Sequence, residues 1–243
     1  MPALKDDAIV LRKLDYSESS QVLALFTRQH GKARVIAKGI KRSTKTRFAP
    51  ALDLLDAGTT VLSVRHPRQE ALAILTEWTQ TRPAGGLRDS LERLYAAQYA
   101  AALTADLTED WDPHPALYDA LADLLAALSS APATLALLVP FQRTLLAEVG
   151  LQPDLTRCVA CDRPDPPAAG LHFSSHEGGL ICRDCESAYY EKRGVTAEVR
   201  TALIGAGGTP RALRGAFELL DYHAAHLTGR PTMLGRAYLD LST

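Results

Sequence analysis

The sequence predicts an α+β protein, with a β-rich start followed by a helical body that carries a small cysteine insert. Short apolar runs separated by turn residues fill the first 80 residues, as is typical of strands. Beyond Thr81–Gly86, apolar residues recur every three or four positions, as expected for helices. Two Cys-x-x-Cys pairs then interrupt the helical pattern. The 243 residues are enough for one large or two modest domains.

Five strands are expected in the β-rich start. Their ranges are Ala8–Lys13, Gln21–Thr27, Lys32–Lys38, Gly58–Arg65 and Ala71–Thr79. Five short strands fit an oligonucleotide/oligosaccharide-binding (OB) β-barrel, although their spacing alone does not separate that fold from an SH3-like barrel.

The helical body is expected to contain seven helices. Their ranges are Arg88–Leu107, Ala116–Leu128, Thr134–Val149, Ser187–Arg193, Thr196–Gly205, Arg211–Leu227 and Leu234–Leu241. We therefore predict a barrel domain over residues 1–80, a first helical part over 81–156, a cysteine insert over 157–186 and a second helical part over 187–243.

The overall composition excludes a general attraction to polyanions or membranes. The 27 basic and 28 acidic residues give a net charge of −1, so any affinity for nucleic acid has to be local. No apolar run approaches the ~18 residues of a membrane span, and the first residues do not resemble a signal peptide. We expect a cytoplasmic protein, in which four cysteines more often bind metal than form disulfides.

The four cysteines form two pairs, Cys158-x-x-Cys161 and Cys182-x-x-Cys185. Each pair lets two thiolates reach one ion from a tight turn, and four sulfur ligands suit a tetrahedral zinc ion with a structural role. An iron–sulfur cluster is the alternative for four thiolates. His172 and His176 lie between the pairs and are expected to be bystanders.

The stretch Arg28–Arg47 carries eight Lys or Arg residues and no acid. Such a local surplus makes a positive patch, which favours nucleic acid, although a solvated hairpin with a charged edge is the competing interpretation. Lys32–Lys38 is expected to carry charge on one sheet face, and Gly39–Arg47 to form a loop. The candidate DNA contacts are Arg28, Lys32, Arg34, Lys38, Lys41, Arg42, Lys45, Arg47 and, for base stacking, Phe48.

Motifs for nucleotide hydrolysis, dinucleotide binding and zinc or serine hydrolysis are absent from the sequence. Glu109, Asp110 and Asp112 could imitate a metal-dependent nuclease, but acids in such a loop are far more often helix caps. A helical adaptor that binds protein partners and has incidental DNA affinity is the other alternative. The residues alone therefore favour a protein that is not an enzyme, and they leave a DNA-binding surface and a solvated hairpin as open interpretations of the basic stretch.

The N-terminal sequence resembles that of the bacterial recombination mediator family RecO. The residues that carry the resemblance are Tyr16, Ser17 and Glu18 in a turn, Leu25–Thr27, Gly31–Lys32 and Lys38–Gly39. The order of segments, with a β-rich start, a helical body and a four-cysteine insert, is also similar to that family. Not all members of the family keep the four cysteines, which suggests a structural metal.

The resemblance implies an OB fold for about residues 1–80. It implies binding of single- and double-stranded DNA, annealing of complementary strands, and action at the nucleoid during repair and recombination. The implied partners are RecR and the single-stranded-DNA-binding protein (SSB), with which recombinase is loaded at gaps. No nucleotide cofactor and no membrane is implied.

Overall fold

The computed structural model describes residues 3–40, 48–49, 52–64, 72–82, 84–132, 135–205 and 207–242, with residues 48–49 described for the backbone only. The chain forms two compact units. The first unit comprises Met1–Ala133 with Ala237–Thr243, and the second comprises Thr134–Arg236.

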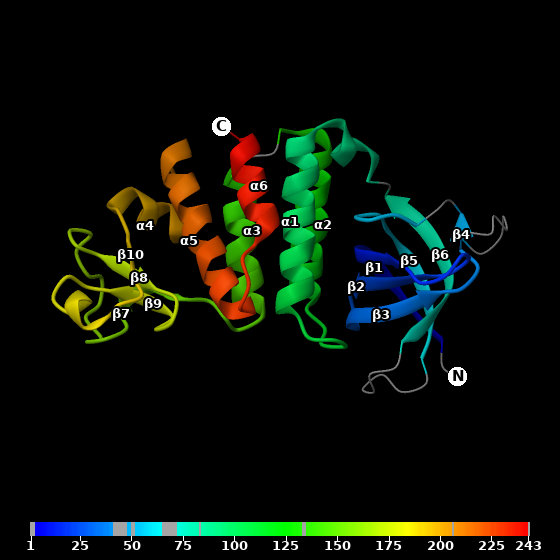
Figure 1. Ribbon diagram of the computed structural model, residues 1–243, viewed down its shortest axis with the longest axis horizontal. Helices are drawn as coiled ribbons and strands as arrows, with labels where there is room; N and C mark the ends of the chain where they lie inside the picture. Colours follow the sequence, from blue (N-terminus) through cyan, green and yellow to red (C-terminus); the bar gives the residue numbers. More distant parts are fainter. Residues whose placement is uncertain are drawn as a thin grey trace. The chain divides into compact units, whose positions relative to one another are not determined.

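The first unit contains a closed β-barrel (Figure 1). Its strands are β1 (Ala3–Asp15), β2 (Gln21–Thr27), β3 (Gly31–Ala37), β5 (Ala57–Ser63) and β6 (Ala73–Arg82), with a two-residue strand β4 (Phe48–Ala49) added beside β6. The strands follow the order β3-β2-β1-β5-β6, and a parallel pairing of β3 with β6 closes the barrel. This five-stranded closed arrangement is the OB fold, so the predicted fold class is confirmed.

Alternation of buried and outward-facing residues is clearest in β3. There Ala33, Val35 and Ala37 are fully buried in the barrel core, while Lys32 and Arg34 lie on the outer face. Register shifts in β1, between Val10 and Arg12, and in β6, where it pairs with β5, mark bulges, which bend strands and help a small sheet to close. The charge alternation predicted for β3 is therefore observed.

The first part of β1, which contains the acids Asp6 and Asp7, was not expected, because the sequence predicts that the first strand begins at Ala8. The structure satisfies these acids within the fold. The Asp6 carboxylate is 8% exposed and accepts hydrogen bonds from the backbone N–H of Gln29 and from His30, both at 2.8 Å. Asp6 is thus a buried hydrogen-bond acceptor for the β2–β3 turn, and it is not a surface residue.

Two helices follow the barrel in the same unit and lie side by side, α1 (Leu91–Leu107) and α2 (Pro115–Ser130). The expected start of the first helix at Arg88 is too early, because Gly85–Asp89 forms a separate 3₁₀ turn, η1. Pro115 is the first residue of α2, a position at which its missing N–H costs nothing.

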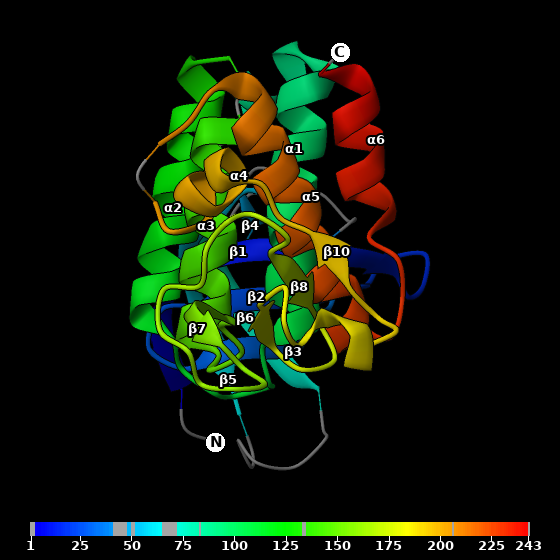
Figure 2. The same ribbon diagram turned by 90° about the vertical axis from the view of Figure 1, so that its left-hand side faces the viewer.

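The second unit combines helices with a small sheet (Figure 2). Its sheet has the order β10-β8-β9-β7, and the four strands are β7 (Asp154–Cys158), β8 (His172–Ser174), β9 (Gly179–Ile181) and β10 (Arg193–Gly194). The helices are α3 (Leu135–Glu148), α4 (Ala197–Leu203), α5 (Pro210–Thr228) and the first turn of α6 (Met233–Leu241), with a 3₁₀ turn η2 (Glu186–Ala188).

The helix expected over Ser187–Arg193 is wrong. The chain there forms only the end of η2 and then β10. The reason is that Glu191 hydrogen-bonds residues of β8 and its turn, and Lys192 donates to the carbonyl of Glu186, which hold the segment out of a helix. Across the described part of the chain, none of the helices is both long enough and apolar enough to span a bilayer.

Candidate metal centre and nucleic-acid interface

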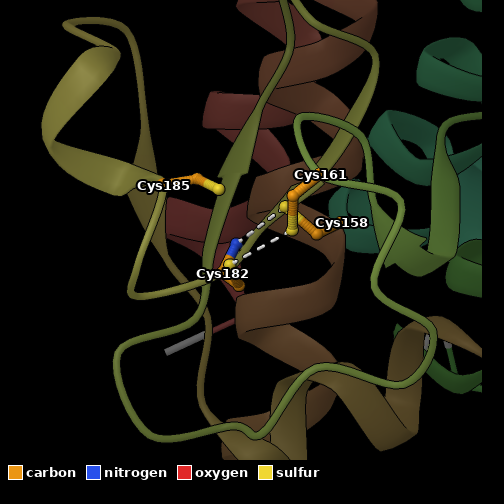
Figure 3. Close-up of side chains that lie close together, drawn as sticks. All are labelled: Cys158, Cys161, Cys182 and Cys185. Carbon is orange, nitrogen blue, oxygen red and sulfur yellow. Dashed lines mark hydrogen bonds between the residues drawn. The ribbon is translucent and has the colours of Figure 1, made fainter.

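The four cysteines converge on one point of the second unit (Figure 3). Their four Sγ atoms all lie within 4.8 Å of one another. Cys158 ends β7 and Cys182 follows β9, and the parallel pairing of these two strands brings the two Cys-x-x-Cys turns together. Among the described residues, these four cysteines are the one group of three or more potential metal ligands whose ligand atoms lie close together.

The cluster fits a tetrahedral metal. The Sγ atoms of Cys161 and Cys182 are 3.8 Å apart, and metal–sulfur bonds of ~2.3 Å in a tetrahedron place two sulfurs about 3.8 Å apart. The backbone N–H of Cys182 also donates to the Sγ atom of Cys158 over 3.3 Å. The four residues can therefore hold one soft metal ion, as the sequence predicted.

The electrostatics of the cluster favour a bound cation. Burial raises the pKa of the Cys158 thiol, but backbone N–H groups of Cys182, Cys161 and Ala160 outweigh burial and lower this pKa to about 6. The pKa of Cys185 is raised to about 12, because its thiol hydrogen-bonds to Cys182 and is desolvated. Four thiolates at this separation repel one another, and a divalent cation removes that repulsion.

The two histidines between the cysteine pairs lie outside the cluster. The Nδ1 atom of His172 contacts the carbonyl of Gly170 at 3.1 Å, and that of His176 contacts the Glu177 carboxylate at 2.8 Å.

A partly buried polar network joins the cysteine-bearing sheet to α5. The Glu191 carboxylate accepts hydrogen bonds from the Ser174 hydroxyl (2.5 Å), from the N–H groups of Ser175 and His176, and from the Tyr222 hydroxyl. Burial raises the pKa of Glu191, but these donors outweigh it and lower the pKa to about 2. The network fixes the turn after β8 against the helix.

The basic stretch divides into three groups in the structure. Arg28, Lys32 and Arg34 are held by acceptors from the α1–α2 region of the same unit, and Lys38 is exposed in the turn after β3. The other predicted contacts lie outside the described residues: Lys41, Arg42, Lys45, Arg47 and the side chain of Phe48. The predicted set of DNA contacts stays a prediction.

The cations of β3 and of the turn before it have specific partners. Arg28, in the turn after β2, forms two hydrogen bonds with the Asp119 carboxylate of α2, at 2.9 and 2.8 Å. Arg34 donates to Asp110, in the α1–α2 loop, at 2.7 Å, and it is still about half exposed. This face of the barrel therefore carries positive charge that is partly balanced by acids of α2 and of the α1–α2 loop.

Two of the acids that could imitate a nuclease site are used in such pairs. Asp110 binds Arg34 and lies 3.5 Å from the Lys32 ammonium, and Asp112 pairs with His114 at 3.2 Å. Sequence reasoning missed Arg12, which pairs with Asp106 on the same face. Only the pairing register across three strands, with Arg12 opposite Ala24 and Ala24 opposite Arg34, brings it to the site.

The barrel and the four-cysteine cluster define a metal-binding OB-fold protein with a basic outer strand. Models of two domains match this chain: "Recombination protein O N terminal" over residues 1–83 and "Recombination protein O C terminal" over residues 88–231. The chain belongs to the RecO family of DNA repair proteins, which confirms the resemblance drawn from the sequence.

Curated relatives extend this match over nearly the whole chain. The DNA repair protein RecO of Anaeromyxobacter sp. (strain Fw109-5) is 32% identical over 98% of this chain and 95% of its own length. The RecO protein of Geobacter metallireducens is 32% identical over 94% of each chain. That of Bacillus pumilus is 30% identical over 76% of this chain and 69% of its own.

Proposed function

We propose that this chain is a DNA-binding recombination mediator without catalytic activity of its own. It binds single- and double-stranded DNA, anneals complementary strands at the nucleoid in the cytoplasm, and acts with RecR and SSB so that recombinase is loaded at gaps. The observation that carries the proposal is the basic outer strand β3 on an OB barrel of the RecO family. OB barrels commonly bind oligonucleotides on this face.

Annealing requires phosphates to be neutralised while base edges stay free to pair. Lys and Arg side chains contact phosphates without reading sequence. In the proposal, Arg34 and Lys38 supply such contacts from the barrel face. Further along the sequence, Lys41, Arg42, Lys45 and Arg47 add such contacts, with Phe48 as a stacking surface.

The proposed metal is one zinc ion held by the four cysteines. When bound, it supplies a cross-link that fixes the two turns, and four protein ligands leave no open position for catalysis. We expect Cys158→Ser to release the metal and loosen the sheet of the second unit, while the barrel stays folded. Elemental analysis and hydrogen exchange measure both effects, and unfolding of residues 1–80 upon chelation would contradict this division.

Charge reversal tests the proposed DNA contacts. Lys41→Glu with Arg42→Glu should weaken binding to single-stranded, duplex and gapped DNA alike, because these groups contact phosphates. Lys5→Glu with Arg211→Glu changes the net charge equally at two exposed positions elsewhere and serves as the control.

Gel shifts and an annealing assay separate the possible outcomes. Loss in the Lys41/Arg42 variant and not in the control supports the mediator. Unchanged DNA binding in the Lys41/Arg42 variant would move the site elsewhere. Retained recombination function despite lost DNA binding would favour the helical adaptor.

A further inference from the structure

A pocket opens on the outer face of the barrel, where β1, β2 and β3 approach the end of α1. Its volume is about 320 Å³, at the lower end of the range for small-ligand sites. The residues that matter for its chemistry are Arg12, Leu14, Val22, Ala24, Arg34 and Asp110. All of them belong to the first unit.

The pairing register creates this pocket. Arg12, Ala24 and Arg34 lie side by side on three neighbouring strands, so that a small residue separates two arginines. With strands ~4.8 Å apart, the two arginine backbones stand about 10 Å from each other. The bulge in β1 contributes, because Leu11 is buried and the next residue, Arg12, faces outward.

The floor of the pocket is apolar and continues toward the β1–β2 hairpin. Leu14 pairs with Val22 in the next row and is 67% exposed. Tyr16, two residues beyond Leu14, is 68% exposed. Both side chains therefore offer apolar surface to a ligand, and the Tyr16 ring is also planar.

The walls of the pocket are cationic, and the hydrogen-bonding capacity of their side chains is only partly used. The side chains of Arg12 and Arg34 are 47% and 53% exposed, and each has one carboxylate partner, Asp106 or Asp110. A guanidinium has five N–H groups and a planar face, so both arginines keep capacity for a phosphate or an aromatic ring. Exposed ion pairs of this type are weak and are readily exchanged.

We propose that this pocket holds one unpaired nucleobase of single-stranded DNA. The base lies over Ala24 and Val22 between the two guanidinium groups, and its flanking phosphates contact Arg12 and Arg34. The Asp110 carboxylate is placed to accept a hydrogen bond from an amino group on the base edge. This inference rests on the proposed DNA-binding function and gives that surface a means to prefer single strands.

The pocket also provides a route to product release. Bases of a duplex are stacked and paired, so none enters the pocket without unpairing. Once two strands have annealed, the captured base is withdrawn and only phosphate contacts remain. Affinity for the annealed product is then lower than for the starting strand.

The test fills the pocket without changing charge. Ala24→Ile places a branched side chain between the arginines, and Thr79→Ile, at an exposed position of β6, is the matched control. Each protein is titrated with a fluorescent single strand, an abasic strand of equal length and a duplex. We expect the wild type and Thr79→Ile to prefer the base-bearing strand over the abasic strand by about tenfold, the scale of one stacked base.

In Ala24→Ile this preference should disappear, while affinities for the abasic strand and the duplex stay unchanged. A preference that survives in Ala24→Ile would overturn the proposal. If Ala24→Ile fails to fold, Arg12→Lys with Arg34→Lys keeps the charge, removes both planar groups and should lose the same preference.

These results are distinguishable from failure of the proposed function. The first case is that the wild type binds DNA, and that Lys41→Glu with Arg42→Glu abolishes this binding. If the wild type then shows no preference for the base-bearing strand over the abasic strand, only the pocket is refuted. If the wild type binds none of the three probes, the DNA-binding function itself is refuted.

Discussion

At the scale of single residues, Lys32 shows that one basic stretch can contain residues with different tasks. Its side chain is only 14% exposed, and its ammonium group donates to the carbonyls of Ala105 and Thr108, at 2.7 and 2.6 Å. These carbonyls lie at the end of α1, where helix acceptors lack partners and a cation complements the dipole. Lys32 therefore fastens the helix to the barrel, a contact that the charge pattern did not reveal.

Replacing Lys32 should destabilise the protein. Lys32→Ala leaves the carbonyls of Ala105 and Thr108 without their donor, so we expect the free energy of unfolding to fall by about 1–3 kcal/mol. Lys38→Ala, at an exposed position, should change it by less than about 0.5 kcal/mol. Urea unfolding measures both, and equal stabilities would contradict the fastening role of Lys32.

Glu191 makes the stability of the second unit depend on pH. Its pKa falls from an ordinary 4.5 to about 2 in the folded protein, so its stabilising effect is present above pH 4.5 and is lost as the pH falls toward 2. Glu191→Gln should cost about 1–2 kcal/mol at neutral pH, because the amide cannot accept all four hydrogen bonds.

Thermal melts between pH 7 and pH 2 check this linkage. The wild type should lose more stability across the acidic range than Glu191→Gln does. Glu148→Gln, which changes an exposed carboxylate of the same unit, should behave as the wild type. Parallel pH profiles for the wild type and Glu191→Gln would refute the assignment.

At the scale of elements, the start of β3 depends on a close approach that only glycine permits. Gly31 has a φ of +72°, and a Cβ atom there would lie 2.0 Å from the carbonyl oxygen of Asp112. The N–H of Trp111 donates to the carbonyl of Lys32 at 2.9 Å, which fixes the α1–α2 loop against the strand. The sequence could not reveal the distant loop that packs on Gly31.

A pair of glycine substitutions isolates this contact. Gly39 has a similar φ of +74°, but a Cβ atom added there would meet no described atom within 4 Å, so Gly39→Ala costs only its backbone strain, about 1–2 kcal/mol. Gly31→Ala carries the same strain and a backbone clash, and should be at least about 2 kcal/mol worse. Similar melting temperatures for the two variants would contradict the close approach.

The elements differ in how far the sequence predicts them. Gln21–Thr27 forms a strand with the expected bounds, because its apolar pattern and flanking turns agree. The first residues of β1 were missed because their acids are satisfied by groups distant in sequence. The expected helix over Ser187–Arg193 failed for the same reason, since Glu191 bonds to another strand.

At the scale of the whole molecule, the sequence predicted the OB barrel, the helical body and the four-cysteine cluster. A β-rich start, the helical body and the cluster follow from alternation, helical periodicity and ligand spacing, which are local signals. The choice of an OB barrel over an SH3-like barrel came from the resemblance to the RecO family. The sequence did not predict that Asp106, Asp110 and Asp119 balance cations of the barrel, because opposite charges were brought together only by folding. The basic surface is therefore smaller and more structured than the charge run implies.

The most direct test of the central proposal, a phosphate-binding basic surface on the barrel, is a salt titration of DNA affinity. If about five cations contact duplex phosphates, log K against log salt concentration should fall with a slope of roughly −4 to −5. Fluorescence anisotropy with a labelled duplex between low and physiological salt gives this slope. A slope near zero would show that phosphate contacts do not hold the DNA and would contradict the account.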